Sequence, residues 1–290
     1  MDGFVNVLKP SGPTASDIVV RLKGIYKQKK IGHLGTLDPG AAGVLPVALG
    51  KGTKLFDFLT FKVKKYRAFF TFGKTTDTLD SYGKVTEKAP FSVDDNKIRV
   101  ATRQFIGKIK QVPPAYSALS INGRRAYDLA RKGVELNIPS REVEVFSFDL
   151  VRQVSYDTWC FDITCGGGTY IRSLAIDLAK ALNTVGYMSC LIRLSSGEFD
   201  ISDAKTIEEI SLDPLGCLLD LQYPLKKLEK LDVPKNLYKQ LQNGVKISDF
   251  RDFDDTMSKI DYQKIYCNGE FFGVGKFVDG KLEIKYRLNG

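Results

Sequence analysis

The segment from Gly32 to Lys54 restricts the backbone more than any other stretch of the chain, because proline and glycines interrupt a series of apolar residues. Asp38 precedes Pro39, and a proline disfavours the helical region for the residue before it. We therefore expect Asp38 on an extended or turn backbone. Glycines on both sides permit tight turns and a close approach of another molecule to the main chain. The same pattern fits a plain turn with an Asx-type hydrogen bond, so the spacing alone leaves a catalytic carboxylate and a turn residue both open.

Length and composition limit the class of protein. The 290 residues, 43% of them hydrophobic, suffice for about two domains with packed cores. No apolar run approaches the ~18 residues of a membrane span, and no secretory signal is expected at the N-terminus. The five cysteines contain no C-x-x-C pair, so we expect reduced, mostly buried thiols in a cytoplasmic protein. With His33 as the single histidine, a structural zinc site is not expected.

The net charge of +9 suits a polyanionic partner, and its distribution strengthens that interpretation. Three basic clusters lie beside the polar motifs. They comprise Arg21, Lys23, Lys27, Lys29 and Lys30, then Lys62, Lys64, Lys65, Arg67 and Lys74, and finally Arg124, Arg125, Arg131 and Lys132. Any one cluster is compatible with a solvated surface. Together they favour a surface that contacts phosphates.

Periodicity predicts an α+β fold. Thr14 and Asp17 form a capping pattern ahead of apolar residues at helical spacing. Alternation predicts a strand over 66–72. The segments 143–151 and 158–164 are predicted as further strands, and 169–182 as a helix entered through Gly166, Gly167 and Gly168. These signals are interspersed without a regular βαβ rhythm, and no G-x-G-x-x-G follows a strand, which argues against a dinucleotide fold.

A second domain is predicted at the C-terminal end. We place the boundary in the charged stretch around Tyr223, which gives domains at residues 1–222 and 223–290. In the second domain, Asn268-Gly269 and Asp279-Gly280 separate alternating apolar runs, which is a double hairpin signal. The sequence therefore predicts a small β-rich unit.

Six blocks of sequence carry a family resemblance. They are LKPSGPTASD at 8–17, GHLGTLDPGAAGVLPVALGKGTK at 32–54, KKYRAFFTFGKTTDTLDSYG at 64–83, QVPPAYSALSINGRRAYDLARKG at 111–133, CGGGTYIRSLAIDLA at 165–179 and LIRLSSGEF at 191–199. In content and order they resemble the TruB family of tRNA pseudouridine synthases. The resemblance implies the pseudouridine synthase fold, a mixed and mainly antiparallel sheet flanked by helices and loops. It also implies that the C-terminal unit is a PUA-like RNA-binding domain.

The resemblance implies an activity without a cofactor or metal. The family isomerises the T-loop uridine U55 of tRNA by breaking the C1′–N1 bond, rotating the base and joining C5 to C1′. Asp38 matches the family's catalytic aspartate, Arg172 the arginine that pairs with it, and Tyr66 the tyrosine that stacks on the target base and helps to remove the C5 proton. Whether Asp38 attacks C1′ or assists a glycal route stays open.

Further residues match substrate contacts of the family. His33 matches the histidine that fills the space left when the uridine is flipped out of its stack. Tyr170 and Leu191 match residues that line the pocket. The chain departs from the family at Ser120, where lysine is usual, which puts one phosphate contact in doubt. The implied partner is the T-arm of tRNA, bound by a cytoplasmic monomer with no membrane and no obligatory protein partner.

Two other functions compete with the stand-alone enzyme. The same fold serves as the catalytic subunit of guide-RNA particles, but the complete block at 111–133 argues against this, because guide-dependent relatives diverge there. A non-catalytic RNA-binding or RNA-folding protein is the other alternative, and the presence of Asp38, Tyr66 and Arg172 together argues against it. RNA-folding assistance is compatible with catalysis.

Overall fold

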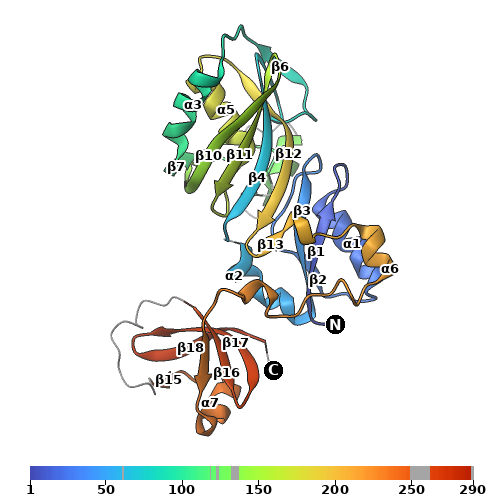
Figure 1. The fold of residues 1–290 in the computed structure, drawn as a ribbon, viewed down its shortest axis with the longest axis vertical. Helices are drawn as coiled ribbons and strands as arrows, with labels where there is room; N and C mark the ends of the chain where they lie inside the picture. The colour runs from blue at the N-terminus through green and yellow to red at the C-terminus, as the bar shows by residue number, and fades with distance from the viewer. Residues whose placement is uncertain (61, 118, 122–123, 132–136, 249–261, 289–290) are drawn as a thin grey trace.

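The computed structural model describes residues 1–60, 62–117, 119–121, 124–131, 137–248 and 262–288. Two sheets dominate these residues (Figure 1). The larger, nine-stranded sheet has the order β1-β3-β12-β4-β11-β10-β7, with β2 paired to β3 and β13 to β12. Its strands are β1 (Gly3–Lys9), β2 (Ile31–His33), β3 (Ala42–Leu49), β4 (Lys64–Phe72), β7 (Gly107–Gln111), β10 (Arg141–Ser155), β11 (Thr158–Cys165), β12 (Gly186–Ser196) and β13 (Phe199–Asp200).

The large sheet is mixed and mainly antiparallel, as predicted. The β3–β12 pair is parallel, with Gly43 beside Arg193, whereas the other pairs of this sheet are antiparallel. Two short hairpins extend from it, formed by β5 (Lys74–Thr76) with β6 (Val85–Lys88) and by β8 (Ser120–Ile121) with β9 (Arg124–Arg125). The parallel pair brings the segment after β2 next to β12, and this arrangement positions the candidate site.

Helices cover the buried face of this sheet. The α-helices are α1 (Ala15–Ile25), α2 (Phe56–Thr60), α3 (Asp95–Thr102), α4 (Ala126–Arg131), α5 (Ile171–Ala181), α6 (Ile207–Leu212) and α7 (Tyr238–Gln242). Short 3-10 helices lie at Gly50–Leu55, Arg103–Phe105, Ile201–Asp203, Tyr223–Leu225 and Lys235–Leu237. Buried residues of α1, α3 and α5 join the sheet in one hydrophobic cluster. Within it, Phe70, Phe148 and Phe161 have ring centroids 4.9 to 6.0 Å apart.

The predicted elements occur where the patterns indicated. Thr14 and Asp17 form a capping box at the start of α1, with each side chain accepting from the other residue's backbone N–H. Strand β4 has one fully buried face and one mixed face. Helix α5 begins at Ile171, two residues later than predicted, because the glycine-rich segment and Thr169 precede it in non-helical conformation.

The C-terminal unit is a five-stranded sheet, which confirms the prediction of a small β-rich, PUA-like unit. Its order is β14-β16-β17-β18-β15, with strands β14 (Lys230–Val233), β15 (Ile247–Ser248), β16 (Gln263–Cys267), β17 (Glu270–Val278) and β18 (Lys281–Arg287). Both predicted hairpin turns are present. Asn268 and Gly269 have φ of 54° and 77°, and Asp279 and Gly280 have 51° and 68°, as a type I′ turn requires.

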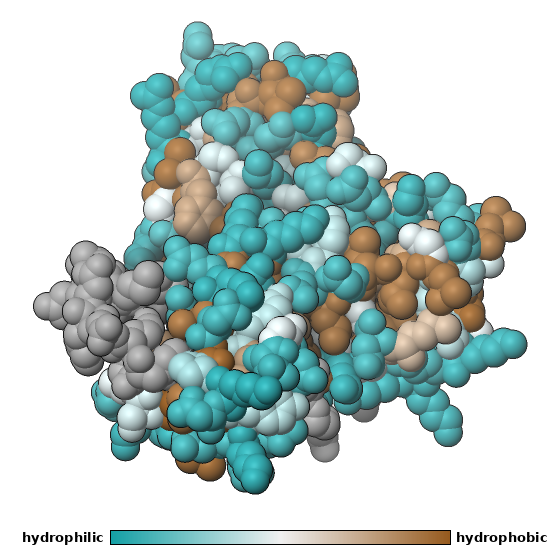
Figure 2. All heavy atoms as spheres, turned by 60° about the horizontal axis from the view of Figure 1, so that its bottom comes forward, coloured by the Kyte–Doolittle hydropathy of each residue, from teal (hydrophilic) through white to brown (hydrophobic). Residues whose placement is uncertain are grey.

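The two sheets share a hydrophobic cluster. Phe58 of α2 packs on Tyr262 and Tyr286 of the C-terminal unit, with ring centroids 5.2 and 5.5 Å away. Figure 2 shows a largely hydrophilic surface on the face where this unit comes forward. Among the described helices, none combines the length and apolar composition that a membrane crossing needs.

The thiols are free and mostly buried, as predicted. No disulfide joins the five cysteines, and Cys160, Cys165 and Cys267 are buried, but Cys217 is half-buried and Cys190 is exposed on β12. Cys190 lies at a register shift in the β4–β12 ladder, where regular alternation no longer predicts which face a residue occupies. In the third basic cluster, Lys132 and the side chains of Arg124, Arg125 and Arg131 lie outside the described residues, as does the side chain of Ser120.

Candidate active site

Asp38 lies in the loop between β2 and β3, and the side chain of Lys9 fixes the backbone of this loop. The Lys9 ammonium, at the end of β1, is fully buried and donates hydrogen bonds to the carbonyl oxygens of Pro10, Pro39 and Ala41 at 2.9, 3.1 and 2.7 Å. Two of these acceptors flank the turn after Asp38. Burial lowers the pKa of Lys9 to about 8, and the charge of Asp38 opposes this shift. One buried cation thus fixes the backbone that carries the carboxylate.

Arg172 holds the Asp38 side chain from the opposite side of the cleft. Its Nε lies 2.9 Å from Asp38 Oδ2, and its Nη2 donates to Oδ1 at 3.1 Å, which gives a two-point contact. The guanidinium is held in turn by the carbonyl oxygens of Thr78 and Tyr116, at 3.0 and 2.8 Å. The Arg172 side chain is 4% exposed and that of Asp38 33% exposed. The carboxylate is therefore the part of this ion pair that another molecule can reach.

Asp80 lies beside the ion pair as a second carboxylate. Its Oδ2 is 3.6 Å from Arg172 Nη1, and its Oδ1 accepts hydrogen bonds from the Thr78 hydroxyl and the Tyr82 backbone N–H. Burial raises the pKa of Asp38 and the negative charge of Asp80 adds to this, whereas the Arg172 guanidinium acts in the opposite direction. Among the groups around Asp38, Arg172 therefore favours the ionised carboxylate most strongly.

Arg193 connects the Asp38 loop to Tyr66. It lies opposite Tyr66 in the β4–β12 ladder, and its guanidinium donates to the carbonyl oxygens of Val44, Gly35 and Thr36 at 2.7, 3.2 and 3.4 Å. Burial raises the pKa of Tyr66 to about 12, while the charge of Arg193 and a hydrogen bond from it act in the opposite direction. The Tyr66 hydroxyl is thus protonated at neutral pH.

The structure brings five of the six predicted site residues into one cleft. Its volume is about 340 Å³, and the described residues that line it include Asp38, Tyr66, Tyr170, Arg172 and Leu191. Tyr170 precedes α5 and is fixed through its backbone by Gln111, whose amide donates to its carbonyl oxygen and accepts from its N–H. The Arg141 guanidinium lies over the Tyr170 ring, 4.6 Å from the centroid.

His33 is the predicted site residue that does not line this cleft. It ends β2, five residues before Asp38. Burial lowers the pKa of His33, and the nearby charge of Arg193 lowers it further, so the imidazole is neutral at pH 7. Its Nδ1 is buried and has no hydrogen-bond partner among the described residues.

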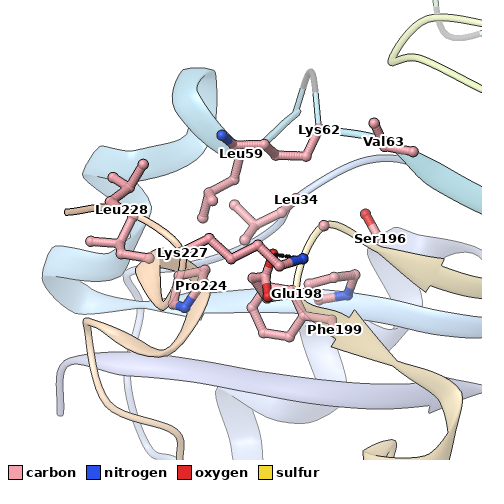
Figure 3. A pocket seen from close by; sticks show the side chains of 13 residues that line it. Leu34, Leu59, Lys62, Val63, Ser196, Glu198, Phe199, Pro224, Lys227 and Leu228 are labelled. Carbon is pink, nitrogen blue, oxygen red and sulfur yellow. Dashed lines mark ion pairs between the residues drawn. The ribbon is translucent and has the colours of Figure 1, made fainter. Parts of the chain in front are cut away.

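A second cavity, of about 250 Å³, lies away from Asp38 (Figure 3). Its lining is largely apolar, and the Lys227 ammonium forms an ion pair with Glu198 Oε1 at 2.9 Å beside it. Of the described residues that line it, only Lys62, a member of the second basic cluster, carries a predicted role. In the described part of the chain, no cluster of His, Cys, Asp and Glu could hold a metal ion.

Sequence reasoning missed the residues that hold the site together, namely Lys9, Asp80, Gln111, Arg141 and Arg193. Two of them left a signal in the sequence. Lys9 directly follows the largely apolar run FVNVL, and Arg193 interrupts LIRL. A cation in a strand that is otherwise apolar is rarely buried without partners, and here its partners are main-chain carbonyls.

Comparison with solved structures identifies the fold. The chain is similar to a chain of a Cbf5-Nop10-Gar1 complex, with a TM-score of 0.75 and 22% identity over 99% of this chain and 85% of that chain. A chain of an H/ACA RNP bound to a substrate RNA containing 2′-deoxyuridine gives a TM-score of 0.72 and 21% identity, over 99% and 85% of the two chains. At these identities the similarity concerns the fold alone, and that fold is the pseudouridine synthase fold, as predicted.

Sequence comparison identifies the family. Residues 23–171 match the model of the TruB family pseudouridylate synthase N-terminal domain. The tRNA pseudouridine synthase B of Clostridium perfringens strain 13 is 38% identical over 282 residues, 95% of each chain. That of Caldanaerobacter subterraneus subsp. tengcongensis is 39% identical over 294 residues, 98% of each chain. This chain belongs to the TruB family of pseudouridylate synthases.

Proposed function

We propose that this protein isomerises the T-loop uridine of tRNA, U55, to pseudouridine as a stand-alone enzyme. The observation that carries the proposal is the Asp38–Arg172 pair, a two-point ion pair at the base of a cleft in a TruB-family chain. The relatives at 38 to 39% identity are named tRNA pseudouridine synthase B, which supports tRNA as the substrate.

In the proposed mechanism, the chemistry centres on Asp38. Its carboxylate either adds to C1′ of the ribose, in a bond that breaks when C5 attacks C1′, or assists departure of the uracil by removing the 2′ proton, which returns to C2′ as C5 bonds to C1′. In both routes the C1′–N1 bond breaks, the uracil rotates, C5 bonds to C1′, and the C5 proton is replaced by one on N1. Arg172 keeps Asp38 ionised and oriented, as an opposite charge at contact distance does. Since the reaction transfers no electrons and no activated group, these side chains suffice.

Tyr66 serves mainly as a stacking surface in this proposal. Its pKa of about 12 keeps the hydroxyl protonated, so removal of the C5 proton by Tyr66 would first require the phenolate, which the contact with Arg193 favours. Leu191 and Tyr170 hold the uracil and the ribose in the cleft. A neutral His33 is suited to stack in the space that the flipped uridine leaves, because stacking needs no particular protonation state.

In this proposal, surfaces outside the cleft bind the RNA. The first two basic clusters and the C-terminal sheet provide surfaces for phosphates, and we place the boundary between the catalytic and the PUA-like RNA-binding domain at residues 222 and 223. The enzyme acts as a monomer, and the clamping that opens the T-arm also allows it to assist tRNA folding.

The test is tritium release from C5-tritiated uridine in one unmodified tRNA transcript, for the purified wild-type protein and for Asp38→Asn. We expect about one equivalent of tritium per tRNA from the wild type and none from the variant, which should still bind tRNA within a few fold of the wild-type Kd. Turnover by Asp38→Asn near the wild-type rate would contradict the role of Asp38. Tight tRNA binding without release by the wild type would contradict the stand-alone activity and point to a guide RNA or a non-catalytic role.

A further inference from the structure

Ser117 lies in the active-site cleft with an unused hydroxyl. It is 3% exposed and lines the same cavity as Asp38 and Tyr66. Its backbone is satisfied, because its N–H donates to Ala115 and its carbonyl oxygen accepts from the N–H of Tyr127. Its Oγ, in contrast, is buried and has no hydrogen-bond partner among the described residues.

The position of Ser117 is tied to the reacting groups. The preceding residue, Tyr116, accepts a hydrogen bond at 2.8 Å from Arg172 Nη2, the same nitrogen that donates to Asp38. A shift of the Ser117 backbone would therefore disturb the Asp38–Arg172 pair. Arg172 thus links the position of Ser117 to that of the Asp38 carboxylate, because it bonds both Tyr116 and Asp38.

An unpartnered buried hydroxyl destabilises the fold relative to a satisfied one, whereas alanine would fill the same backbone position without that cost. Among the described residues, one other buried hydroxyl, Thr75 Oγ1, has no partner either, whereas further buried hydroxyls are satisfied within the protein. Thr184, 7% exposed, donates to the carbonyl oxygen of Pro90 at 3.1 Å. In the described part of the chain, five buried side-chain polar atoms have no partner, and two of them, Ser117 Oγ and Arg141 Nε, belong to residues that line this cleft. Such atoms are rare in folded proteins and call for an explanation.

We propose that the Ser117 hydroxyl is a substrate-binding group that hydrogen-bonds a polar atom of the uridine held in the cleft. This inference rests on the proposed function and adds a residue to it. A uridine offers O2, O4, N3–H and the ribose 2′-hydroxyl, and a serine hydroxyl can donate to or accept from any of these. Binding of the uridine satisfies the group that the free protein leaves without a partner.

The test compares Ser117→Ala with Thr184→Val, which removes a buried but satisfied hydroxyl of a residue that does not line the cleft. We expect Ser117→Ala to keep or raise the thermal midpoint and to lower kcat/KM for tritium release about tenfold. Thr184→Val should lower the thermal midpoint and keep kcat/KM within twofold of the wild type. If the wild type releases tritium and Ser117→Ala has wild-type kcat/KM, the proposal is overturned. If the wild type releases no tritium, the proposed function itself is refuted. This outcome is distinct from a failure of the Ser117 proposal alone.

A binding measurement distinguishes a direct contact between the Ser117 hydroxyl and the uridine from an indirect effect of the substitution on the shape of the cleft. In the Asp38→Asn background, the Kd of a T-arm hairpin is measured with and without Ser117→Ala, using uridine, 2-thiouridine, 4-thiouridine or 2′-deoxyuridine at the target position. A direct contact predicts that the loss caused by Ser117→Ala disappears for the one analogue that lacks or weakens the partner atom. An equal loss for all four hairpins, and for a fifth with 3-methyluridine, which lacks N3–H, would show a structural effect and refute the contact.

Discussion

Replacing Arg172 by methionine removes the charge that keeps Asp38 ionised while retaining much of the apolar stem. Two charged hydrogen bonds to Asp38 are lost, at 2.9 and 3.1 Å. Each such contact contributes about 1.5–3 kcal/mol, and the sum must be reduced because Asp38 is one third exposed. A net loss of about 2–3 kcal/mol corresponds to a fall of roughly 30- to 150-fold in the single-turnover rate at pH 7.

The pH dependence of this variant carries the sharper expectation. Burial raises the pKa of Asp38 and Arg172 opposes that shift, so the Arg172→Met variant should have a still higher pKa. Because the carboxylate is the active form, the acidic limb of the rate profile should move to higher pH, and alkaline solution should recover part of the rate. Arg172→Lys is the matched control. It keeps the charge but cannot form the forked contact, so its rate should fall while its acidic limb stays near that of the wild type.

The assay is single-turnover tritium release between pH 5.5 and 9.5, with folding checked by near-ultraviolet circular dichroism at each pH. In Arg172→Met the folded state holds the Asp38 proton more tightly than the unfolded chain does. Its stability deficit should therefore grow as pH rises through the pKa of the folded state. An acidic limb at the wild-type position in Arg172→Met would refute the argument that Arg172 controls the ionisation of Asp38.

Two further substitutions probe the loop that carries Asp38. Lys9→Met removes three hydrogen bonds but also the cost of burying an ammonium group, so we expect a loss of about 1–3 kcal/mol by thermal unfolding and a slower single-turnover rate. Because the folded pKa of Lys9 is about 8 and its ordinary value 10.5, wild-type stability relative to Lys9→Met should rise between these pH values, and a constant difference would argue against the buried ammonium. Gly43→Ala should lower the thermal midpoint far more than Gly12→Ala. Both glycines have φ above +100°, but an added Cβ would lie 2.3 Å from the Arg193 carbonyl oxygen at Gly43 and would meet no atom within 4 Å at Gly12. Equal midpoints would contradict that close contact.

The elements of this fold could be predicted wherever local chemistry decides them. The capping box at Thr14 and the Asn268-Gly269 turn are set by residues within a few positions of each other, and both occur as expected. The end of β10 and the exposure of Cys190 were not predictable in this way, because register shifts in the sheet break the alternation. A bulge depends on the neighbouring strand, which the local pattern does not include.

The candidate site shows the same limit more strongly. Asp38 and Arg172 are 134 residues apart in sequence and lie 2.9 Å apart in space, and their pairing could be expected because family resemblance supplied it. Nothing comparable was available for Arg193, whose role depends on the parallel pairing of β3 with β12. That pairing places the Arg193 side chain against the loop that carries Asp38, where it bonds the carbonyl oxygens of Gly35 and Thr36. The apolar residues around Arg193 indicate that it is buried, but they do not indicate which loop it contacts, because long-range pairing of strands is a property of the whole topology.

The placement of cations explains why a cleft of this kind is stable without its substrate. Among the described residues that line it, Lys64, Arg141, Arg172 and Arg193 are basic and Asp38 is acidic, an excess of positive charge that would be costly to bury without partners. Main-chain carbonyl oxygens largely offset this cost. They accept hydrogen bonds from Arg172 and Arg193 in the cleft and from Lys9 at the loop that carries Asp38. Carbonyl partners neutralise no charge. The cleft therefore keeps its positive potential for a polyanionic RNA, while the single carboxylate that another molecule can reach remains available for chemistry.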